Sequence, residues 1–290
     1  MQRILFVFFI LISLVVKAQW DDDTTRYTKG WNLGINAGVY FASKNQAGYY
    51  DGRPSNENNI DYVFSNTYWY QDIKNKLMDE VSRDNFWIAE YPMDMHYNPS
   101  LYAGFSARYN FSADFSINVH FNFGKLKLID AFNIEVDPPL PGSVHSYIPC
   151  SITGEESRSN IDFSMLFAFP DKNHSPLKPF AELGFNLNSV NVKSSQIQIY
   201  DLVFNLRNVY GDVGYIPNTG TTEYTVKQGG VGFGLFSAAG VRYEMSRDFS
   251  IELCCQLYYS TIHLTGYTGF GLHYAPMLRL VLSPSMINLN

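Results

Sequence analysis

Five charged residues stand within segments that are otherwise apolar or rich in small residues: Arg108, Glu182, Arg242, Glu252 and Arg279. From Glu182 onward their signs alternate along the chain. A charge removed from bulk water needs a partner of opposite sign. The set therefore predicts ion pairs, provided that the fold brings these residues together away from solvent.

Two histidines, His120 and His273, lie in similar segments. A metal site would need a third ligand at matched height, and none is evident. Hydrogen-bonded histidines are the favoured interpretation, so we predict no metal or cofactor. A lipid-acting hydrolase would need a Ser/His/acid group facing the lipid, whereas His174 and Ser175 lie in a predicted turn at the opposite end. No enzymatic signature is found, and the chain is predicted not to be an enzyme.

The cysteines give no redox site. Three cysteines cannot form a full disulfide framework. Cys254 and Cys255 are adjacent on a predicted strand and so point to opposite faces. Cys150 lies in a predicted loop. Structural or incidental thiols are the favoured interpretation.

The elements that must position these residues are strands, because apolar residues recur with a period of two. The alternation also fits the 21 Tyr, 22 Phe and 21 Gly of the chain, an excess typical of strands. It predicts eight strands, at residues 31–41, 101–109, 115–124, 161–169, 181–187, 233–243, 249–259 and 270–282.

Alternation alone does not say which face is inside. A soluble barrel of the lipocalin type would turn its apolar face inward. Here the polar face is rich in Gly, Ser and Asn, which fit a narrow interior, and the apolar face carries Phe, Leu and Ile. Tyr and Trp lie near strand ends, as in an interfacial girdle. Most strands alternate for about ten residues, the length that a tilted strand needs to cross a bilayer.

The connections favour the membrane alternative further. Three links are short, near 110–114, 170–179 and 246–248, and they alternate with longer ones at 42–98, 127–157, 188–230 and 260–268. All long loops therefore leave one end, as in outer-membrane barrels. The predicted fold is an all-β, eight-stranded antiparallel up-and-down transmembrane β-barrel with long extracellular loops.

The N-terminus predicts export. An apolar run from Ile4 to Val16 follows Arg3, and it is too short for a membrane-spanning helix. We expect a cleaved signal peptide at 1–18, a short segment at 19–30, the barrel at 31–283 and a tail at 284–290. No later stretch is long enough for a spanning helix.

Two sequence patterns resemble a known family. The segment Gly232-Phe-Gly-Leu-Phe-Ser-Ala-Ala-Gly-Val-Arg-Tyr243, followed by a turn and Asp248-Phe-Ser-Ile-Glu-Leu253, is similar to small outer-membrane barrels of the OmpA/OmpX type. Ala18-Gln19 and the Tyr-rich strands resemble versions from the Bacteroidota. The resemblance covers about residues 30 to 283 and implies an outer-membrane location without fixing an activity. The chain departs from the family in its longer loops and in the lack of a terminal aromatic residue.

In the predicted barrel the five charged residues all point inward near the short-turn end, and His120 and His273 point inward nearer the middle. An ion-pair plug that fixes strand register is one interpretation. A gate that opens when the pairs rearrange is the other. An eight-stranded lumen is only wide enough for side chains, which argues against free diffusion.

The first long loop is unusually aromatic, and we expect it to fold as a lid over the barrel mouth, to present a partner-binding surface, or both. A helix is expected at 70–83. The candidate partner-binding residues are Tyr62, Tyr68, Trp69, Tyr70, Trp87 and Tyr91.

The predicted function is a non-enzymatic accessory or structural subunit of an outer-membrane complex. Its expected partners are outer-membrane lipid, lipopolysaccharide and other outer-membrane or surface proteins. A net charge of −6 argues against nucleic acid. The alternatives are a small gated pore, a surface adhesin or a lipid-modifying barrel enzyme.

Overall fold

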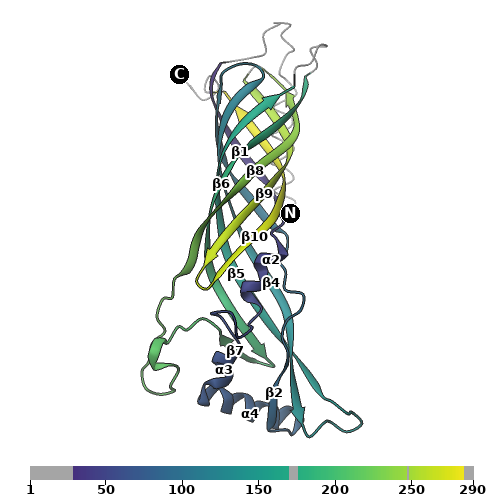
Figure 1. The fold of residues 1–290 in the computed structure, drawn as a ribbon, viewed down its shortest axis with the longest axis vertical. Coiled ribbons are helices and arrows are strands. Elements are labelled where there is room, and N and C mark those ends of the chain that lie inside the picture. Colours follow the sequence, from purple (N-terminus) through teal and green to yellow (C-terminus); the bar gives the residue numbers. More distant parts are fainter. Residues whose placement is uncertain (1–28, 170–175, 247, 284–290) are drawn as a thin grey trace, which may run out of the picture.

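A closed antiparallel ring of eight strands forms the body of the protein (Figure 1). The computed structural model describes residues 29–169, 176–246 and 248–283. Each predicted strand falls on one strand of the ring, so the predicted eight-stranded antiparallel β-barrel is confirmed. In ring order the strands are β1 (Gly30–Tyr40), β3 (Ser100–Asn110), β4 (Phe115–Asp137), β5 (Tyr147–Ala168), β6 (Leu177–Ile199), β8 (Gln228–Glu244), β9 (Phe249–Leu264) and β10 (Tyr267–Leu282).

Pairing of β1 with β10 closes the ring, with Ile35 opposite Leu280. Outward positions on neighbouring strands then form apolar rows, such as Phe163 opposite Phe185 between β5 and β6. Such cross-strand pairs stabilise the sheet. Small residues allow close approach on the inside: a Cβ placed on Gly184 would lie 2.0 Å from the carbonyl oxygen of Phe163.

The polarity of the two faces identifies the solvent around the ring. Large apolar side chains such as Leu183, Phe185 and Leu235 are more than half exposed on the outside. Asn118, Glu182 and Arg279 are fully buried on the inside. An apolar exterior around a polar interior is the arrangement that a hydrocarbon environment requires. The ring is therefore a transmembrane barrel. None of the helices within the described part of the chain is both long and apolar enough to cross a bilayer, a finding that does not bear on strands.

Three strands continue beyond the apolar band at one end. β4 has 23 residues, β5 has 22 and β6 has 23, about twice the length that spans a bilayer. The expected loop at 127–157 was therefore wrong, because β4 and β5 continue and turn only at 138–146. β6 likewise takes residues to Ile199 from the expected loop at 188–230. Cys150 lies on β5, buried, and not in a loop.

The extended strands belong to an extramembrane module (Figure 1). We define the module as segments 125–137, 147–159 and 188–199 with residues 42–98 and 200–227. It contains two strands that edge the extended sheet, β2 (Asn85–Glu90) beside β4 and β7 (Leu202–Asn205) beside β6. Its helices are α2 (Lys44–Ala47), η1 (Gly48–Tyr50), α3 (Asp61–Ser65), α4 (Thr67–Val81) and η2 (Gly211–Val213).

The long helix α4 overlaps the expected helix at 70–83 and begins earlier, because the side chain of Asn66 accepts hydrogen bonds from the backbone N–H groups of Tyr68 and Trp69. It ends at Val81, and the next residue, Ser82, adopts a left-handed conformation that terminates the helix. The expected signal peptide at 1–18, most of the segment 19–30, the tail 284–290 and the His174-Ser175 turn lie outside the described residues.

Candidate functional site

The predicted inward charges meet near the short-turn end of the barrel. Glu252 on β9 forms a bidentate ion pair with Arg108 on β3, which donates from Nη1 to Oε1 at 2.5 Å and from Nη2 to Oε2 at 2.8 Å. Arg242 on β8 donates from Nε to the same carboxylate at 2.8 Å. Two arginines from different strands thus share one buried acid.

Glu182 on β6 holds the remaining arginine. Arg279 on β10 donates to it with Nη1–Oε1 at 2.5 Å, and the same Nη1 lies 3.6 Å from Oε2 of Glu252. We call Arg108, Glu182, Arg242, Glu252 and Arg279 the inner charge cluster. Its two carboxylates are linked through Arg279 into one network. Both acids are fully buried, so each charge is neutralised inside the barrel and not by water.

Uncharged polar groups complete the coordination of Glu182. Asn118 donates to its Oε1 at 3.0 Å, and Nε2 of His120 lies 3.2 Å from its Oε2. His120 is thus a hydrogen-bonded lumen histidine. His273 lies apart from it, where its Nδ1 accepts the backbone N–H of Ser43 at 3.0 Å.

A second buried ion pair, between Glu156 and Arg158 on β5, lies toward the module. Nη2 of Arg158 donates to Oε1 of Glu156 at 2.6 Å. We call these two residues the outer pair. Neither residue was predicted from sequence, because the loop expected at 127–157 includes Glu156 and the strand after it was expected to begin only at residue 161, beyond Arg158. The signal was present, since the inward phase of β5 runs without interruption from Glu156 through Arg158 and Asn160 to Asp162.

The outer pair holds the first long loop in the barrel mouth through hydrogen bonds. Nη1 of Arg158 donates to Oε1 of Gln46 at 3.0 Å, and Gln46 donates in turn to the carbonyl oxygen of Ser260. Tyr50 donates to Oε2 of Glu156 at 2.8 Å. Burial raises the pKa of the Tyr50 hydroxyl well above its usual value, so the hydroxyl remains a donor. Segment 43–50 therefore closes the mouth.

The module has an apolar core on the sheet face that continues the lumen. Buried side chains there include Leu126, Phe132 and Ile134 of β4 and Ile152 of β5. Helix α4 covers this face with the buried side chains of Trp69, Ile73 and Leu77. Trp69 stacks on Tyr215 at 5.2 Å between ring centroids. The helix and the loop that contains Tyr215 therefore pack as one body.

The predicted loop aromatics divide between this core and the surface. Trp69 is only 6% exposed and is not available to a partner, because it lies inside the apolar core of the module. Three others are partly buried by contacts within the module: Tyr62 with Asn208, Tyr70 stacked on Phe86, and Tyr91 with Asp61. Tyr68 and Trp87 are 44% and 43% exposed.

The opposite face of the extended sheet is uncovered. Trp87 and Tyr147 flank Glu135 on it, and Tyr147 is 49% exposed. The next row toward the barrel contains Glu90 opposite Asn133, and the two rows after it, at Ala131 and Ile129, carry neutral side chains. We call this surface the outer sheet face, and it consists of Trp87, Ile129, Ala131, Tyr147, Ser151, Thr153, Gln196, Gln198 and Val203.

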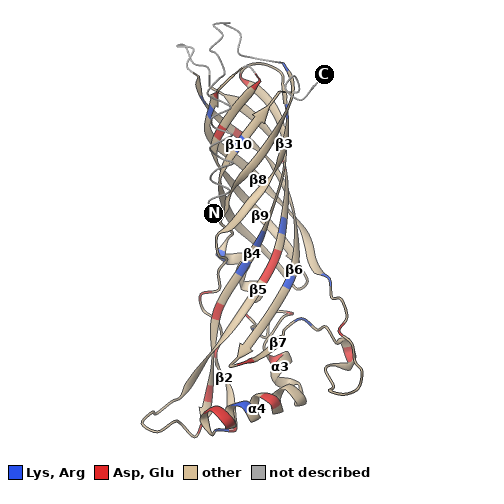
Figure 2. Ribbon diagram, turned by 180° about the vertical axis from the view of Figure 1, so that it is seen from behind, with Lys and Arg blue, Asp and Glu red and all other residues tan. Residues whose placement is uncertain are grey.

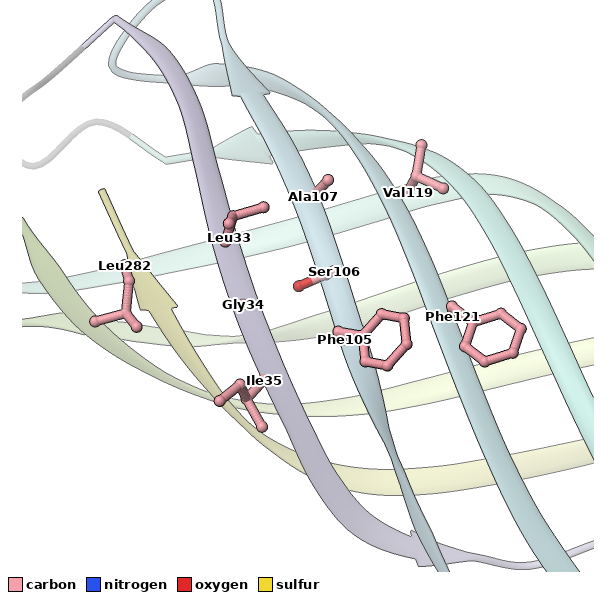
Figure 3. A pocket seen from close by; sticks show the side chains of 9 residues that line it. All are labelled: Leu33, Gly34, Ile35, Phe105, Ser106, Ala107, Val119, Phe121 and Leu282. Atoms are coloured by element: carbon pink, nitrogen blue, oxygen red, sulfur yellow. The ribbon is translucent and has the colours of Figure 1, made fainter. Parts of the chain in front are cut away.

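An apolar groove of about 520 Å³ lies on the lipid-facing side of the barrel, over β1, β3 and β4 (Figure 3). It exists because Ala107 leaves space between the larger outward residues around it, including Leu33, Phe105 and Val119. In the described parts of the chain, no three His, Cys, Asp or Glu side chains are grouped to hold a metal ion.

Comparisons with known proteins add little to this geometry. No protein-family model matches the chain, and no curated protein matches it by sequence. Neisserial surface protein A has 10% identity and a TM-score of 0.43, over 88% of this chain and 97% of that chain. For the outer membrane protein OprG from Pseudomonas aeruginosa the values are 8%, 0.39, 89% and 95%.

Ail, the attachment invasion locus protein of Yersinia pestis, was solved in complex with the heparin analogue sucrose octasulfate. It has 10% identity and a TM-score of 0.33, over 88% of this chain and 98% of that chain. All three TM-scores are below 0.5. The barrel is therefore identified by its own strand ring and its apolar outer face.

Proposed function

We propose that this protein is a non-enzymatic outer-membrane barrel, exported through a cleaved signal peptide at 1–18, that acts as a structural or accessory subunit. Its closed barrel anchors the extramembrane module outside the cell, and the module binds a partner protein. The observation that carries the proposal is the outer sheet face, where the exposed Trp87 and Tyr147 flank Glu135 and the rows at Ala131 and Ile129 are neutral and uncovered.

The composition of that face supports a protein partner. Interface cores are depleted in charge and enriched in Trp and Tyr. The aromatic residues best placed to anchor a partner are therefore Trp87, among the loop aromatics predicted from sequence, and Tyr147, which that prediction did not include. Residues that lie inside the module, such as Trp69, position the sheet instead.

The packing of the lumen supports an anchor over a pore. The inner charge cluster crosses the barrel at one end, and segment 43–50 closes the other. Between them lie buried aromatic side chains such as Tyr102, Phe236 and Tyr258. A conducting path would require several of these groups to leave together.

Partner capture from native membranes tests the proposal. Affinity-tagged wild type, extracted in mild detergent, is expected to retain a partner that the double variant Trp87→Ser, Tyr147→Ser loses, because aromatic anchors carry much of an interface's binding energy. The matched control is Tyr68→Ser, Tyr224→Ser, which removes two aromatic residues exposed elsewhere on the module. Wild type that travels alone, or a partner lost equally from both variants, would contradict the proposal.

A further inference from the structure

A basic and polar patch lies on the outer face of β4, β5 and β6, directly beyond the apolar band. On β4 the band ends at Phe123, and the next outward residues are Lys125 and Lys127. We call Lys125, Lys127, Ser157, Asn191 and Lys193 the boundary patch. Figure 2 shows basic residues where β4 and β6 continue beyond the rest of the barrel.

Strand pairing brings the patch together. Lys125 is opposite Ser157, which in turn is opposite Asn191. The β5–β6 register shifts at a bulge, and Lys193 is the residue of β6 that has no partner on β5 there. It lies next to the row that contains Lys127. Two strand spacings place the lysines of β4 and β6 about 10 Å apart. Ser157 and Asn191 supply hydrogen-bond donors between them.

The lysines carry charge that the protein hardly neutralises. Lys125 and Lys193 are exposed, and neither forms an ion pair with any residue that the structure describes. Lys127 has its nearest acid at 3.9 Å, in Glu155. Three positive charges against one negative charge leave the patch with an excess of two, which matches a phosphate monoester of about −1.5 to −2 charges.

The height of the patch coincides with the headgroup layer. Lys125 and Lys127 lie two and four residues past Phe123. At a rise of about 3.3 Å per residue and a strand tilt of about 40°, these steps correspond to roughly 5 and 10 Å along the membrane normal. Headgroups occupy about 5 to 7 Å on each side of the hydrocarbon. Flexible lysine side chains reach this layer from both positions.

We propose that the boundary patch binds the phosphate monoester of membrane lipid headgroups in the leaflet on the module side. The lysines contact the phosphate oxygens, Ser157 and Asn191 donate hydrogen bonds, and the acyl chains lie along the apolar outward residues below. The patch is open and shallow and would bind a free phosphate weakly. Lipid phosphates are concentrated in the headgroup layer at this height, and that concentration is what allows the patch to be occupied. Occupancy fixes the depth of the barrel and thereby the height of the module. The inference rests on the proposed function in one respect only: it takes the end of the barrel that carries the module to face the outside of the cell.

Native mass spectrometry of the full chain in detergent micelles tests the site, with dioctanoyl phosphatidic acid and dioctanoyl phosphatidylcholine as probes. Wild type is expected to retain phosphatidic acid preferentially. The variant Lys125→Gln, Lys127→Gln, Lys193→Gln should bind it at least about tenfold more weakly, because each lysine contributes to the attraction. Glu155→Gln, which removes the acid of the patch, should bind it a few-fold more tightly.

The matched control is Lys29→Gln, Lys74→Gln, Lys227→Gln, which removes the same charge outside the patch and should bind like wild type. Equal retention of the two lipids, or unchanged binding by the patch variant, would overturn the proposal. Displacement of the lipid by an equal concentration of inorganic phosphate would also overturn it and point to a soluble anion. Because the patch variant keeps the outer sheet face, its partner capture tests the proposed function separately.

Discussion

The membrane barrel and the extramembrane module share three strands, β4, β5 and β6, whose two faces have opposite polarity in the two regions. Within the barrel, β6 turns Leu183 and Phe185 outward and buries Glu182 and Asn186. Within the module, the same strand buries apolar residues such as Ile197 and exposes Gln198. The backbone alternation does not change, but the surrounding solvent does. In the barrel the outward face is apolar because it contacts hydrocarbon, and in the module the outward face is polar because it contacts water.

The contrast extends to how each interior is held together. The barrel interior depends on ion pairs and amide hydrogen bonds, with acids such as Glu252 contacting arginines of several strands. Beyond the outer pair at the barrel mouth, the module interior depends on close packing of apolar side chains under α4. Removal of a charged side chain should therefore lower the free energy of unfolding most in the barrel. Weakening of helix α4 should loosen the module alone.

The largest effect is expected inside the barrel. Glu252→Ala would leave Arg108 and Arg242 buried without their shared acid, and we expect the free energy of unfolding to fall by about 3–5 kcal/mol. Urea titration in lipid vesicles, read by heat-modifiable gel migration, measures it. Glu80→Ala removes an exposed partner of Lys76 in the module and should change little. Equal effects of the two variants would contradict the distinction between the regions.

A second prediction compares two outward positions on β6. Leu183→Arg places a charge in the hydrocarbon and should destabilise the barrel by about 2–4 kcal/mol. Gln198→Arg places the same side chain on the same strand outside the membrane, where surface substitutions usually stay within about 0.5 kcal/mol. The same urea titration compares them. A large loss at Gln198 would mean that the apolar environment reaches into the module.

The smallest effect is expected at the start of α4. Asn66→Ala removes the acceptor for two backbone N–H groups and should cost about 1 kcal/mol. The loss should appear as faster hydrogen exchange in α4, while the heat-modifiable migration of the barrel stays unchanged. Asn66→Asp keeps the acceptor and loses only the hydrogen bond that Nδ2 donates to the carbonyl oxygen of Tyr215 at 3.2 Å, so it separates the two contributions of the side chain. Simultaneous loosening of barrel and module would show that the two regions unfold as one unit.

Sequence reasoning found all eight ring strands because each has apolar alternation over most of its length, as between Phe115 and Phe123. It failed beyond the membrane for a physical reason. On β4 the apolar phase switches after Phe123, and Leu126 and Leu128 take over on the other face. A strand that passes from lipid into water must make this switch, and the switch resembles the end of a strand.

The candidate site was predictable only in part. The residues of the inner charge cluster could be selected because their inward phase follows from alternation. Glu156 and Arg158 were not predicted, because they lie just past the point where the apolar residues change from one face of the sheet to the other. Trp69 and Trp87 belong to the same aromatic loop, and composition does not distinguish them. Packing against Tyr215 buries the first, whereas pairing of β2 with β4 exposes the second.

The sequence by itself determined which residues share a face and that eight strands cross the membrane, because both follow from a period of two and from strand length. Only the tertiary structure decided how the charges pair, where the strands leave the bilayer and which aromatic side chains meet solvent. These depend on closure of the ring and on the docking of α4, which join residues far apart in the chain. Alternation is a local property, whereas burial depends on everything that packs above the sheet.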